Sequence, residues 1–138
     1  MAFPPAEIRA LVADPSSHMA GLVTLMLHSL KVRAVDEAGD LAHLSASLAR
    51  RPYDLLLIED QLGAENDFEV IRALRRSTGH PNRLVPIVMM AGGGQPELFE
   101  TAREAGVSGF LRKPFSARHI GLRLEAIRLA AGTERQSA

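Results

Sequence analysis

Residues 53–60 read Tyr-Asp-Leu-Leu-Leu-Ile-Glu-Asp, an apolar run that ends in acidic side chains. Within it, Leu55–Ile58 is apolar at every position, which predicts a strand buried on both faces, because a strand with one solvent face would alternate apolar and polar residues. Ile8–Ala13 and Gly109–Leu111 are two further, largely apolar runs. Such strands are typical of a parallel sheet that helices cover on both sides.

An ionisable residue follows each of these runs. Asp14, Asp60 and Lys113 stand where the first, second and third run stop. The carboxyl ends of parallel strands face a common crevice, so these side chains, although far apart in sequence, are predicted to meet at one edge of the sheet.

Helical patterns separate the strand candidates, with apolar residues recurring at helical spacing. The signals for the helix ends are N-caps at Ser16 or Ser17, Asp40, Asn66 and Ser116, a first-turn Pro96, a stop at Pro52 and a C-cap at Gly106. Further strands are predicted at Val32–Val35 and Pro86–Met90, and the last helix is expected to end at about Ala131. Five strands alternating with five helices predict the α/β class with a doubly wound, five-stranded parallel sheet.

The length and composition indicate one domain with no net charge. The 138 residues carry 16 basic and 16 acidic side chains and no cysteine. Because the charges balance, there is no net electrostatic attraction toward nucleic acid or an anionic membrane. The sequence has no recognisable signal peptide or membrane span. We expect a single cytoplasmic domain over residues 1–138, with a core from about 8 to 131 and a frayed tail at 132–138.

Three segments together resemble the receiver domain of two-component response regulators. They are Leu-Val-Ala-Asp-Pro-Ser-Ser (11–17), the 53–60 stretch, and Gly-Phe-Leu-Arg-Lys-Pro-Phe (109–115), and the resemblance covers essentially residues 8–131. It implies a flavodoxin-like, CheY-like fold and a role in phosphorelay signalling rather than an enzyme. The implied partners are a histidine kinase or histidine phosphotransfer protein and a downstream protein.

The resemblance also implies roles for single residues. Asp60 matches the aspartate that accepts the phosphoryl group, and Lys113 the lysine that contacts that group. Asp14 and Asp60, with the backbone carbonyl of Leu62, would hold Mg²⁺, and Pro114 would follow a cis peptide bond. Attack on a phosphorus atom shielded by negative oxygens needs cations, which the metal ion and the lysine would supply.

The chain departs from the family pattern at several of these positions. Pro15 replaces the second of two adjacent acids, so we expect Mg²⁺ to bind weakly. The switch positions carry Ala91 in place of a Ser or Thr, and Phe110 in place of Tyr. Alternatively, Pro15 merely starts a helix, and Glu65 or a water completes the metal shell.

Three functions therefore remain open. The first is a receiver phosphorylated on Asp60. The second is a phosphorylation-independent pseudo-receiver that acts as a protein-interaction scaffold. The third, a flavodoxin-like enzyme with a bound cofactor, is disfavoured because Asp14 would repel a cofactor phosphate.

Two further assignments concern the site and the last helix. Glu59 is set aside as a ligand because it points to the strand face opposite Asp60. In the last helix, Leu122 and Leu129 lie opposite the stripe expected to face the sheet. We expect them to form, with the fourth helix and fifth strand, a surface for a homodimer or a downstream partner.

Overall fold

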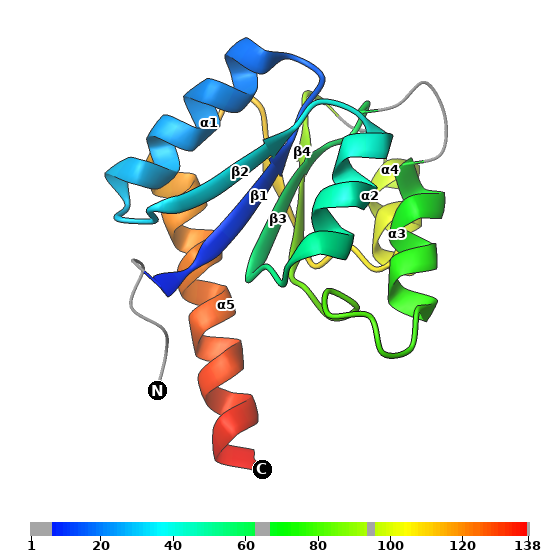
Figure 1. Cartoon of the computed structure of the whole chain (residues 1–138). Helices are drawn as coiled ribbons and strands as arrows, with labels where there is room; N and C mark the ends of the chain where they lie inside the picture. Colours follow the sequence, from blue (N-terminus) through cyan, green and yellow to red (C-terminus); the bar gives the residue numbers. More distant parts are fainter. Residues whose placement is uncertain (1–6, 63–66, 94–95, 138) are drawn as a thin grey trace.

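The computed structural model describes residues 7–62, 67–93 and 96–137, and it shows one sheet with helices on both sides (Figure 1). The strands are β1 (Arg9–Ala13), β2 (Ala34–Ala38), β3 (Leu55–Glu59), β4 (Ile87–Ala91) and β5 (Gly109–Arg112). The helices are α1 (Ser17–Ser29), α2 (Leu41–Arg50), α3 (Asp67–Arg76), α4 (Pro96–Ala105) and α5 (Ala117–Ser137). All paired strands are parallel, in the order β2-β1-β3-β4-β5, which confirms the predicted doubly wound α/β fold.

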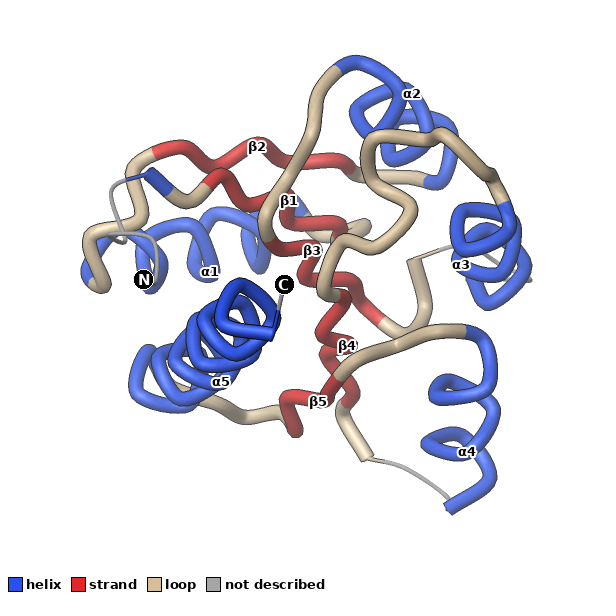
Figure 2. Tube along the Cα trace, turned by 90° about the horizontal axis from the view of Figure 1, so that it is seen from below, coloured by secondary structure: helices blue, strands red, loops and turns tan. Residues whose placement is uncertain are grey.

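The two faces of the sheet pack against different helices. Figure 2 shows α1 and α5 on one side and α2, α3 and α4 on the other. Along β3, Leu55 and Leu57 belong to the core on the α1/α5 side, whereas Leu56 and Ile58 belong to the core on the α2/α3/α4 side. Every residue of β3 and β4 is buried, as the continuous apolar runs predict.

Local signals locate several helix ends correctly. The Ser16 hydroxyl accepts a hydrogen bond from the Met19 amide, and the Asp40 carboxylate accepts one from the amide of His43, so both predicted N-caps are confirmed. Gly106 follows α4 with a φ of 122°, a conformation that the absence of a side chain permits. The predicted cap Asn66 lies outside the described residues.

Two elements, β2 and α5, differ from the prediction by more than one residue. β2 occupies Ala34–Ala38 rather than Val32–Val35, because pairing with β1 begins at Ala34. β2 is an edge strand, so it tolerates the polar Asp36 and Glu37 that obscured it in the sequence.

The last helix is longer than predicted, since α5 runs to Ser137 instead of ending near Ala131. Once a helix is nucleated, each added residue gains a hydrogen bond, and Glu, Arg and Gln in this stretch are good helix formers. Among the described residues, no helix is both long and apolar enough to cross a bilayer.

Candidate functional site

The predicted site residues lie at the carboxyl edge of the sheet. The backbone amides of Asp14, Asp60 and Lys113 continue the strand ladders, donating to carbonyls of β2 and β4 over 3.0, 3.0 and 2.8 Å. Each residue therefore extends its strand by one step and brings its side chain to this edge. This placement is the one that the ends of the apolar runs predict.

The side chain of Lys113 pairs with a carboxylate next to Asp60 in the sequence. Its ammonium donates a hydrogen bond to the Oε2 atom of Glu59, the last residue of β3, and the two groups form an ion pair. Side-chain alternation explains the choice, because Glu59 follows Leu57 by two residues and Lys113 follows Leu111 by two, and both leucines pack on the α1/α5 side. The sequence predicts that Glu59 is not a metal ligand, but it does not predict this ion pair.

The Glu59 carboxylate is largely shielded from solvent. Its side chain is 11% exposed, and that of Lys113 is 27% exposed. Burial raises the pKa of Glu59, and the neighbouring Asp60 carboxylate raises it further, while Lys113 acts in the opposite direction. The net direction is upward, so burial and the second acid outweigh the lysine. Asp60 itself begins the turn after β3 and is only half-buried.

Asp14 is buried and only partly satisfied. Its Oδ1 atom accepts a hydrogen bond from the amide of Ser16 over 2.9 Å, which closes a tight turn into α1. Its Oδ2 atom is buried and has no hydrogen-bond partner within the described part of the chain. Pro15 lies between these two residues, is exposed, and offers no side-chain ligand.

The acidic side chains do not assemble a metal cage. Within residues 7–62, 67–93 and 96–137, no three His, Cys, Asp or Glu side chains are grouped so that they could hold a metal ion. Asp14 offers one free oxygen, but Glu59 is engaged by Lys113. The alternative ligand Glu65 lies outside the described residues, and a role for the Leu62 carbonyl stays a prediction. The described acids therefore do not form a cluster of three side-chain ligands, and the expected set of Asp14, Asp60 and the Leu62 carbonyl stays a prediction.

The expected switch positions have no hydroxyl at the site. Ala91 ends β4 and is buried, so it can contribute only a methyl group. The Phe110 ring packs edge-on against Phe99 with ring centroids 4.7 Å apart, and the Arg103 guanidinium lies 5.9 Å from the Phe110 ring centre. The predicted cis bond before Pro114 is confirmed.

The α5 leucines are exposed, as the helical period predicts. Leu122 and Leu129 have exposed fractions of 53% and 64%. Leu122 borders a shallow hollow that also includes Phe110, Lys113 and Phe115, so the ammonium of the acidic site and this apolar surface are neighbours.

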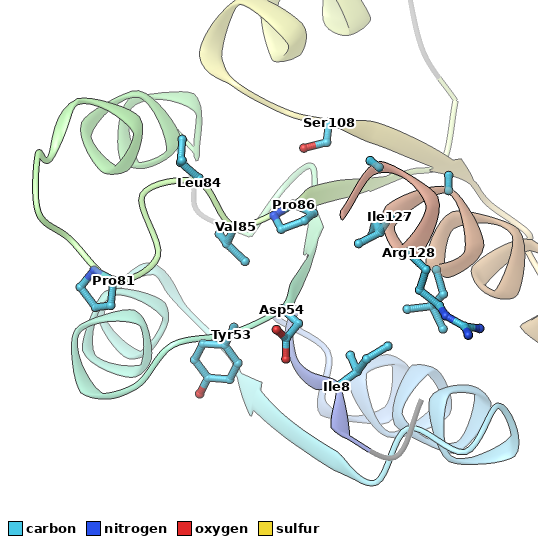
Figure 3. A pocket seen from close by; sticks show the side chains of 13 residues that line it. Ile8, Tyr53, Asp54, Pro81, Leu84, Val85, Pro86, Ser108, Ile127 and Arg128 are labelled. Carbon is cyan, nitrogen blue, oxygen red and sulfur yellow. The ribbon is translucent and has the colours of Figure 1, made fainter. Parts of the chain in front are cut away.

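A second hollow, of about 670 Å³, lies at the opposite, amino-terminal edge of the sheet (Figure 3). Residues from the starts of β1 and β3, the segment before β4, and α5 line it. Its carboxylate, Asp54, accepts a hydrogen bond from the Arg9 amide and so connects β1 to the residue before β3. This hollow is remote from the strand ends that carry Glu59 and Lys113.

A family model and a curated relative both match this chain to response regulators. A family model described as the response regulator receiver domain matches residues 10–125. The transcriptional regulatory protein ResD of Bacillus subtilis is 28% identical over 121 residues, which cover 88% of this chain and 48% of that protein. The chain thus spans about half the length of this curated relative.

Solved structures show the same fold. The chemotaxis response regulator CheY4 of Vibrio cholerae aligns with a TM-score of 0.77 and 22% identity, covering 87% of this chain and 98% of that one. The receiver domain of a Pseudomonas aeruginosa sensor histidine kinase aligns with a TM-score of 0.75 and 24% identity, covering 86% and 95%. That domain was described with a magnesium ion coordinated in the active site cleft.

Proposed function

The chain belongs to the response regulator receiver family, and we propose that it signals through protein contacts without phosphorylation as its switch. Receivers are signalling modules rather than classical enzymes, and phosphorylation and Mg²⁺ are typical of them. In this chain the residues at the phosphorylation site favour the phosphorylation-independent form. We place it in the cytoplasm, where kinases and their receivers meet.

The observation that carries the proposal is the ion pair between Lys113 and Glu59. Phosphoryl transfer needs cations at the acceptor to spread the charge of the entering group. Here the lysine already neutralises a buried carboxylate, and moving it to a phosphoryl group would leave that carboxylate without a counter-charge. A buried charge without its partner is strongly destabilising, so the pair opposes the transfer.

Ala91 weakens any response that a phosphoryl group would produce. Shifting a two-state protein from about 1:99 to 99:1 needs roughly 5.5 kcal/mol of differential binding. A hydrogen bond from a hydroxyl to a charged group supplies about 1.5–3 kcal/mol of it. With only a methyl group at this position, up to about half of that free energy is lost.

A competing function is phosphorylation of Asp60, favoured by its half-buried position at the mouth of the site. An acidic residue there is open to a small phosphodonor, whereas Glu59 is covered. If Asp60 accepts the group, a histidine kinase or phosphotransfer protein is the donor.

The output surface that we propose is the face formed by α4, β5 and α5. Leu122 and Leu129 give it apolar area, and the hollow beside Leu122 reaches Lys113. The occupant is a downstream protein or a second copy of the chain. The balanced charge supports a protein partner over nucleic acid.

Labelling with a small phosphodonor tests the proposal. We would incubate the chain with acetyl phosphate and Mg²⁺, trap acyl phosphate with hydroxylamine, and locate it by mass spectrometry. We expect no label above that of an Asp60→Asn variant. Stoichiometric label on Asp60, absent from Asp60→Asn, would establish the competing function, and label on Glu59 would contradict both.

A further inference from the structure

The acidic site contains a cation that belongs to the chain itself. The Lys113 ammonium hydrogen-bonds Glu59 and forms an ion pair with it. Glu59 is 9% exposed, so its charge is poorly solvated by water. Any folded state with an ionised Glu59 requires a positive group at this point.

A magnesium ion would compete with the lysine for the same oxygens. Mg²⁺ binds through one or two carboxylates and keeps the rest of its shell as water. Glu59 is engaged by Lys113 and is not available as a metal ligand while that ion pair holds. Pro15 supplies no substitute, because its side chain has no oxygen.

We infer that the Lys113 ammonium is the resident cation of this site and takes the place of a divalent metal ion. The inference rests on the proposed function, since a site that transfers no phosphoryl group has no need of a metal to assist transfer. It goes further, because it assigns to Lys113 the electrostatic role of the metal. The folded domain is then indifferent to Mg²⁺.

Removing the lysine makes the inference testable. Lys113→Met leaves the buried Glu59 carboxylate without its ammonium, and a divalent ion can then serve as the counter-charge. The melting temperature of this variant should fall in EDTA and recover in part in millimolar MgCl₂, but not in NaCl of equal ionic strength. Lys113→Arg keeps the charge and should stay indifferent to the metal, as should the wild type.

Arg112→Met is the matched control. Arg112 is the exposed residue beside Lys113 and, by strand alternation, projects to the other face of the sheet. Its loss removes the same formal charge without touching Glu59. We expect this variant to melt at the wild-type temperature with or without Mg²⁺.

Mn²⁺ binding, followed by the electron paramagnetic resonance signal of the free ion, gives a second measurement. We expect the wild type to leave millimolar Mn²⁺ free, and Lys113→Met, or Lys113→Gln if the first variant does not fold, to reduce the free signal. A wild type that binds Mn²⁺ or gains melting temperature in Mg²⁺, or a Lys113 variant that responds no more than the wild type, would overturn the inference.

The same samples separate this inference from the proposed function. A metal-responsive wild type that takes no label from acetyl phosphate would end the inference and leave the proposed function standing. A wild type that is indifferent to metal yet labelled on Asp60 would contradict the proposed function, while the observation that the domain does not respond to Mg²⁺ would stand.

Discussion

The Glu59–Lys113 pair should be asymmetric, in that losing the lysine costs more than losing the glutamate. Lys113→Met leaves a buried carboxylate without a counter-charge, a change that costs about 3–5 kcal/mol in fully buried pairs. Because the Lys113 side chain is 27% exposed, water can partly replace it, and we expect a loss of about 2–4 kcal/mol. Glu59→Gln leaves the exposed ammonium in contact with water and an amide that still accepts a hydrogen bond, so its loss should stay below about 1 kcal/mol.

The assay is urea unfolding at neutral pH, followed by circular dichroism, with equal m-values as the check that the unfolded states are comparable. Arg112→Met again serves as the control and should lie within about 0.5 kcal/mol of the wild type, as exposed substitutions usually do. Lys113→Met and Glu59→Gln could instead lose equal free energies of unfolding, or Glu59→Gln could lose more. Either result would show that the burial of Glu59 does not determine the stability contributed by the ion pair.

The pH dependence of stability tests the burial of Glu59 in a second way. The folded-state pKa of Glu59 is raised above its unfolded value, so the folded protein binds more protons between the two values and its stability falls as pH rises through that window. Glu59→Gln removes this contribution. Relative to the wild type, the variant should therefore gain stability between mildly acidic and neutral pH, and a constant difference would contradict the raised pKa.

The remaining predictions concern the output surface, the metal ligands and the structural core. Leu122→Glu with Leu129→Glu should weaken self-association or partner binding, measured by analytical ultracentrifugation, while a folded monomer indifferent to both changes would eliminate this surface. Pro15→Asp adds a carboxylate beside Asp14 and should give measurable Mg²⁺ affinity by calorimetry; unchanged affinity in a folded variant would point to the Glu59–Lys113 pair as the obstacle. Asn82→Ala removes the buried amide that accepts from the Tyr53 amide and donates to two carbonyls, and should cost about 3 kcal/mol in urea unfolding at about 1 kcal/mol per bond, whereas a loss below about 1 kcal/mol would mean that water replaces it.

The sequence predicts the fold well wherever a local signal is sufficient. Continuous apolar runs locate β1, β3, β4 and β5 because a strand buried on both faces has no polar position to obscure it. Ser16 and Asp40 locate helix starts because a cap acts within one turn. β2 was displaced because an edge strand can carry polar residues, so its position depends on pairing with β1 rather than on composition.

The sequence predicted which strand ends meet at the site, but not the ion pair between Glu59 and Lys113, and the reason is geometric. A strand end fixes where a backbone emerges, but side-chain alternation decides which face each residue serves. The sequence contained that signal, since Glu59 and Lys113 each stand two residues beyond a core leucine, Leu57 and Leu111. The prediction from sequence uses this alternation to set Glu59 aside as a metal ligand, but does not apply it to Lys113.

Seen together, the departures at this edge of the sheet compensate one another. A glutamate is one methylene longer than an aspartate, and its carboxylate meets the ammonium of Lys113 directly. Under the proposed function, a site with that charge neutralised requires no metal ion, and the missing acid at Pro15 carries no penalty. If no phosphoryl group binds, as we propose, the missing hydroxyl at Ala91 carries none either. Here Glu59 has Lys113 as its cation, whereas Asp14, which is more buried, keeps one oxygen without a partner in the described part of the chain, so the compensation is confined to the Glu59–Lys113 pair.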